Sequence, residues 1–93
     1  MSLDFRNYTE DAVLHLMDEV LKNYPGCCKC EQCRMDIAIL ALNHLPPRYI
    51  STQKGNLYAK IEEMSIEYKI KVIGEIAKAV EIVSRNPRHA KAS

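Results

Sequence analysis

The chain has 93 residues, of which 47% are hydrophobic and 27% are charged, and its formal net charge is +1. This balance is typical of one folded domain over residues 1–93 and excludes a disordered or collagen-like chain. The near-neutral charge excludes a strongly basic module, so we expect no direct nucleic-acid binding. No apolar run approaches the ~20 residues of a membrane span, and the first residues lack the apolar core of a signal peptide. We therefore expect a cytoplasmic protein without membrane insertion.

Residues 8–24 have the apolar periodicity of an amphipathic helix. Asn7 is placed to cap its first turn, and Glu10, three residues further on, completes a capping box. The Pro25-Gly26 pair ends the helix. The apolar positions that predict it are Ala12, Val13, Leu16, Met17, Val20, Leu21 and Tyr24.

A second helix is expected from about Glu31 to His44. Its residues 37–42 form an unbroken apolar run, and a helix that is apolar all round is buried on most sides. We therefore expect this helix to be the central one, ending before Pro46-Pro47.

A polar connection over residues 46–56 leads to a short helix expected from Leu57 to Met64. Ser65 can cap a last helix that runs to about Ser84, and the apolar arc of this helix is wider than one packing partner needs. We expect part of the arc to bury against a second copy in a homodimer, whereas the alternative is a helix sandwiched between the other two. The elements together predict an all-α fold, a small bundle of about four helices. The arc includes Ile66, Ile73, Val80 and Val83.

All four cysteines, Cys27, Cys28, Cys30 and Cys33, lie within seven residues between the first two helices. Disulfides inside so short a window would close only small loops, and the cytoplasm is reducing. A thioredoxin-like redox pair needs a strand–helix context, and the sequence has no strand pattern. Thiolates are common ligands of structural zinc, and the gap between Cys30 and Cys33 is that of a zinc knuckle. We therefore expect a zinc ion held by Cys28, Cys30 and Cys33.

Two residues compete for the fourth position on the zinc ion. Cys27 is the nearest, but neighbouring side chains of an extended chain point to opposite sides, so Cys27 and Cys28 can hardly face one ion together. His89 lies just beyond the last helix, and imidazole is a good zinc ligand. We favour His89 and keep Cys27 as the alternative.

Together, several segments resemble the late competence development protein ComFB family. This resemblance implies a small, all-helical, dimeric protein with a structural zinc ion, and it assigns the metal to Cys28, Cys30 and Cys33. Cys27 lies outside that three-cysteine pattern. The segments are Asn-Tyr-Thr-Glu-Asp-Ala-Val at 7–13, Met-Asp-Glu-Val-Leu at 17–21, Cys-Lys-Cys-Glu-Gln-Cys-Arg-Met-Asp-Ile-Ala at 28–38, Ala-Leu-Asn-His-Leu-Pro-Pro-Arg-Tyr at 41–49 and Asn-Pro-Arg-His at 86–89.

The sequence contains no Ser–His–Asp order, glycine-rich phosphate loop or converging carboxylate pair, so we expect no enzymatic activity. Two functions are left. The first is a zinc-stapled adaptor that dimerises and binds a protein partner. The second, which the resemblance also implies, is a receptor for cyclic di-GMP or cyclic di-AMP that signals to a partner. Such a ligand needs cations for its phosphates and flat groups for its bases. The residues that could supply them are Arg48, Tyr49, Lys54, Tyr58 and Lys60.

Overall fold

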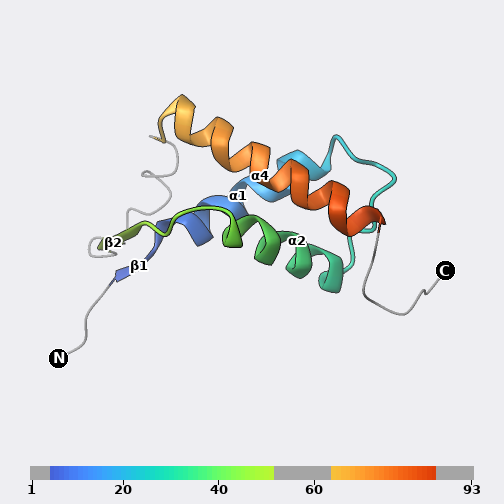
Figure 1. Ribbon diagram of the computed structural model, residues 1–93, viewed down its shortest axis with the longest axis horizontal. Coiled ribbons are helices and arrows are strands. Elements are labelled where there is room, and N and C mark those ends of the chain that lie inside the picture. Colours follow the sequence, from blue (N-terminus) through green and yellow to red (C-terminus); the bar gives the residue numbers. More distant parts are fainter. Residues whose placement is uncertain (1–4, 52–63, 86–93) are drawn as a thin grey trace.

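The structure is a computed structural model, and it describes residues 5–51 and 64–85 of the chain. Helix α4 packs against both α1 and α2, and a two-stranded antiparallel sheet stands at the start of α1 (Figure 1). The loop between α1 and α2 lies at the opposite end of the long axis from the sheet. In chain order the elements are β1 (Phe5–Asn7), α1 (Tyr8–Leu21), α2 (Glu31–Asn43), β2 (Tyr49–Ser51) and α4 (Ile66–Arg85).

Helix α1 begins where the sequence predicts and ends earlier. Asn7 is its N-cap, with extended backbone and a side-chain oxygen that accepts from the backbone N–H of Thr9 at 3.0 Å. The predicted end at Tyr24 is wrong by three residues. Beyond Leu21 the α-helical hydrogen-bond pattern is replaced by tighter turns, because Asn23 and Tyr24 each donate their N–H to the carbonyl three residues back instead of four.

Helix α2 is less buried than the sequence predicts. Its buried residues include Cys33, Ile37 and Ala41, which face α1 and α4. Met35 and Ile39, however, are each 49% exposed. The expectation of a central helix buried on most sides is therefore wrong for one face, because only two described helices pack against α2.

Helix α4 has the cap that the sequence predicts, since Tyr68 N–H donates to the Ser65 hydroxyl at 3.1 Å. Val80 and Val83 are buried in the core of the same chain, so these two residues of the predicted dimer arc cannot contact a second copy. The exposed apolar residues of α4 are Ile66, Ile70 and Ile82.

The sequence predicts no strands, whereas residues 5–51 contain two. In the register of the sheet, Phe5 stands opposite Ser51 and Asn7 opposite Tyr49. Strands of three residues are too short for an alternating pattern to be visible in a sequence. The all-α prediction is otherwise confirmed, with three helices in the described part. The helix predicted over 57–64 lies outside the described residues except for Met64.

One hydrophobic core joins the three helices. Its largest fully buried aliphatic side chains come from α1 (Val13), α2 (Ile37) and α4 (Val72, Ile76 and Val80). None of the described helices is long and apolar enough to cross a bilayer.

Candidate functional site

The loop between α1 and α2 brings three cysteine sulfurs together. The Sγ atoms of Cys28, Cys30 and Cys33 all lie within 4.8 Å of one another. Cys30 is the N-cap of α2, and its sulfur accepts from the backbone N–H of Cys33 at 3.4 Å. Cys33 therefore sits in the first turn of the helix, and its side chain is buried whereas those of Cys28 and Cys30 are exposed.

Burial and the neighbouring thiols oppose ionisation of Cys33. The pKa of the Cys33 thiol is raised from 9.0 to about 12, chiefly by burial and also by hydrogen bonds and electrostatic repulsion from Cys28 and Cys30. Three thiolates this close need a compensating cation. The buried Cys33 thiol therefore holds a proton that a bound metal ion would displace.

The donor set fits zinc. A tetrahedral ion with Zn–S bonds of ~2.3 Å separates two sulfurs by roughly 3.8 Å, and the observed cluster lies within 4.8 Å. The helix N-terminus at Cys30 adds a positive dipole end that stabilises thiolate. When bound, such an ion would supply a cross-link from the loop to the first turn of α2.

Cys27 does not belong to this cluster. Its thiol donates to the carbonyl oxygen of Cys28 at 3.3 Å, and its half-buried side chain packs against the core. The three mutually close sulfurs do not include that of Cys27. The other predicted fourth ligand, His89, lies outside the described residues.

Of the second predicted site, only Arg48 and Tyr49 lie within the described residues. The guanidinium of Arg48 lies over the ring of Tyr68, 4.5 Å from its centre. The ring of Tyr49 makes an edge contact with Phe5 across the sheet, at 5.9 Å between centroids. Each side chain thus has its own intramolecular partner. The three other predicted ligand residues, Lys54, Tyr58 and Lys60, lie outside the described residues.

Sequence reasoning missed a buried polar junction at the start of α1. The Thr9 side chain is fully buried, and its hydroxyl lies 2.9 Å from the carbonyl oxygen of Pro46 and 3.0 Å from the hydroxyl of Tyr68. Because a carbonyl only accepts, Thr9 donates to Pro46 and accepts from Tyr68. Thr9 falls on the helical stripe of Val13, four residues on, which is the signal that could have revealed it.

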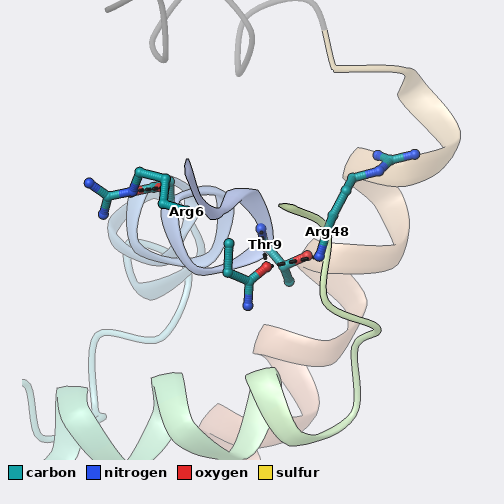
Figure 2. Close-up of polar contacts among 5 residues, drawn as sticks. Arg6, Thr9 and Arg48 are labelled. Atoms are coloured by element: carbon teal, nitrogen blue, oxygen red, sulfur yellow. Dashed lines mark hydrogen bonds and ion pairs between the residues drawn. The ribbon is translucent and has the colours of Figure 1, made fainter. Parts of the chain in front are cut away.

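Asn7 ties the same junction to the sheet. Its side-chain oxygen accepts from the N–H groups of both Thr9 and Arg48. Figure 2 shows Thr9 and Arg48 close together at the start of α1, with the Arg48 guanidinium extended toward α4. The rings of Tyr8 and Tyr68 stack there at 6.0 Å. The residues after α2 are therefore held to both α1 and α4, so the conformation of Arg48 depends on packing.

The model of a known protein family matches most of the chain. Residues 6–87 match the model of the family described as late competence development protein ComFB, and the chain belongs to that family. It is 26% identical over 81 residues to the competence protein ComFB of Bacillus subtilis (strain 168), covering 87% of this chain and 83% of that protein.

The fold has a counterpart among solved structures. The structure titled a structural characterization of the late competence protein ComFB from Bacillus subtilis matches with a TM-score of 0.77 and 24% sequence identity. The match covers 96% of this chain and 98% of the other. At that identity the likeness supports the fold alone.

Proposed function

We propose that this protein is a small cytoplasmic adaptor of the competence type, which carries a structural zinc ion, forms a homodimer and binds a protein partner without catalysing a reaction. The single observation that carries the proposal is the convergence of the Cys28, Cys30 and Cys33 sulfurs between α1 and α2. The family is named for late competence development and not for a reaction, which supports a regulatory role.

The zinc ion would be held by the three cysteines and His89. The C-terminal end of α4 lies at the same end of the long axis as the cysteine loop in Figure 1, which supports a ligand from the residues that follow. His89 comes four residues after Arg85, and four residues of extended chain reach about 13 Å. This ligand set would tie α4 to the loop and close a long stretch of chain. Cys27 is the alternative fourth ligand.

The dimer would use the exposed side of α4. Ile66 and Ile70 stand one turn apart and are 74% and 64% exposed. Covering these side chains with a second copy would stabilise the dimer by about 25 cal/mol per Å² of apolar surface buried. A symmetric pair presents this patch twice, which favours a closed dimer.

The adaptor and the cyclic dinucleotide receptor are separated by calorimetric titration with cyclic di-GMP and cyclic di-AMP, paired with elemental analysis of the purified protein. We expect about one zinc per chain and no heat of ligand binding. The contacts of Arg48 with Tyr68 and of Tyr49 with Phe5 give these residues a packing role, which favours this outcome. Saturable binding of either nucleotide would instead establish the receptor, and zinc-free folded protein would contradict the metal.

A further inference from the structure

An open groove of about 540 Å³ runs between α1 and α2. Within the described part of the chain, every residue that lines it belongs to one of these two helices, and none to α4. Its apolar residues are Leu14, Met17, Met35, Ala38 and Ile39.

Three of these side chains are unusually exposed for their size. Leu14 is 52% exposed, and Met35 and Ile39 are 49% exposed each. Scattered apolar residues are normal on a surface, but here three of them share one groove. Met35 and Ile39 are four residues apart, so they form one stripe along α2 that faces the groove together.

The shape of the groove fits a helix. Two packed helices leave a furrow on each side of their contact. Helix α4 fills one of these furrows by packing against both α1 and α2. The groove is the second furrow, lined by the same two helices. Met17 and Met35 are unbranched and adapt to an incoming side chain, and apolar grooves of this kind bind the apolar face of an amphipathic helix.

The charged residues that line the groove are one carboxylate, Glu31, and one guanidinium, Arg34. Asp11 is paired with Arg6, whose Nε lies 2.7 Å from Oδ2, and Asp18 is paired with Arg34. Glu31, which lines the groove, and Glu10, one turn before Leu14, add negative charge beyond these pairs. Because Asp18 neutralises Arg34, Glu31 and Glu10 are the carboxylates that form the acidic rim of the groove.

We propose that this groove, with its exposed stripe of Leu14, Met35 and Ile39 and its acidic rim, binds a basic amphipathic helix of the protein partner. The proposal rests on the adaptor function proposed above and names the chemistry of its partner. Leucine-like side chains of the helix enter the groove, and its lysine or arginine residues meet Glu10 and Glu31.

A synthetic helical peptide with leucine at positions i, i+3, i+4 and i+7 and lysine elsewhere is the probe, and the same peptide with glutamate for lysine is its control. We expect the lysine peptide to bind, with an affinity that falls as salt is added, and the glutamate peptide to bind at least about tenfold more weakly. In protein labelled at its methionine methyl groups, the peptide should shift the NMR signals of Met17 and Met35. Met64, which packs against the core outside the groove, should not shift.

Ile39→Glu should weaken peptide binding at least about tenfold. Ile82→Glu is the matched control, because Ile82 is 48% exposed but lies on α4 and lines a different pocket. Its affinity should stay within about twofold of the wild type. Three results would contradict binding of a basic helix in the groove: equal losses of peptide affinity in both variants, no loss of affinity in Ile39→Glu, or equal binding of the two peptides. Conversion of the dimer to a monomer by Ile39→Glu would also overturn it, since the groove would then be the dimer interface.

The same samples separate the two proposals. Zinc content and oligomeric state are measured on the wild type and on both variants. If wild-type protein holds zinc and dimerises but the peptide fails to bind, only the groove is contradicted. If the wild type lacks zinc, the adaptor proposal itself is contradicted, whatever the peptide does.

Discussion

Replacing Thr9 by valine removes a single hydroxyl from the junction of α1, α4 and the segment after α2. Valine has nearly the same shape as threonine, so the substitution leaves no large cavity. It removes the hydrogen bond to the Pro46 carbonyl at 2.9 Å and the one from Tyr68 at 3.0 Å. The Thr9 side chain is fully buried, so water cannot replace the hydroxyl at this position without a rearrangement.

The expected loss follows from these two bonds. Each contributes about 0.5–1.5 kcal/mol net, so Thr9→Val should lower the free energy of unfolding by roughly 1–3 kcal/mol. For a domain of this size, a loss of about 2 kcal/mol lowers the melting temperature by roughly 8–16 °C. Tyr68→Phe removes only the bond from its hydroxyl while keeping the ring beneath Arg48, so it should cost about 0.5–1.5 kcal/mol.

Urea unfolding followed by circular dichroism measures these differences. Thr9→Ser is the control, because it keeps the hydroxyl and loses only a methyl group. Since Thr9→Val and Tyr68→Phe remove the same bond, the double variant should be more stable than the sum of the two losses implies. Thr9→Val within about 0.5 kcal/mol of the wild type, or strict additivity in the double variant, would refute the junction as a source of stability.

Three further predictions concern the metal, the dimer and the second site. His89→Ala should reduce zinc retention during dialysis more than Cys27→Ser does, because the Cys27 sulfur lies outside the cluster; the reverse order would make Cys27 the fourth ligand. Ile70→Glu should give a monomer by light scattering with wild-type zinc content, and a persisting dimer would exclude this face of α4. The double change Arg48→Ala with Tyr49→Ala should leave the zinc content intact but lower the melting temperature, because it removes the contacts with Tyr68 and Phe5. An unchanged melting temperature would show that neither residue is needed for packing and would favour a ligand-binding role.

The sequence was sufficient where local chemistry decides the structure. Asn7 and Ser65 could be recognised as caps because a side-chain oxygen before a helix satisfies free N–H groups whatever the rest of the fold does. The meeting of Cys28, Cys30 and Cys33 could also be predicted, because this spacing, with a helix beginning after Cys30, is one that lets the sulfurs turn toward one metal ion.

The sequence was insufficient where tertiary contacts decide. The apolar run of α2 implied burial on most sides, but burial depends on how many helices pack around it, and Ile39 is left half-exposed. The strand pairing of Asn7 with Tyr49 joins residues far apart in the chain and leaves no local pattern. The partners of Thr9 are likewise distant, since Tyr68 lies 59 residues further on.

Thermal unfolding with and without a zinc chelator tests the central claim that a metal ion at Cys28, Cys30 and Cys33 holds the fold together. Structural zinc binding contributes about 10–16 kcal/mol, as much as the whole stability of an ordinary domain. We therefore expect chelation to release about one zinc per chain and to abolish the cooperative transition, and Cys30→Ser to unfold or aggregate without a chelator. Metal-free protein that melts at the wild-type temperature would contradict the account.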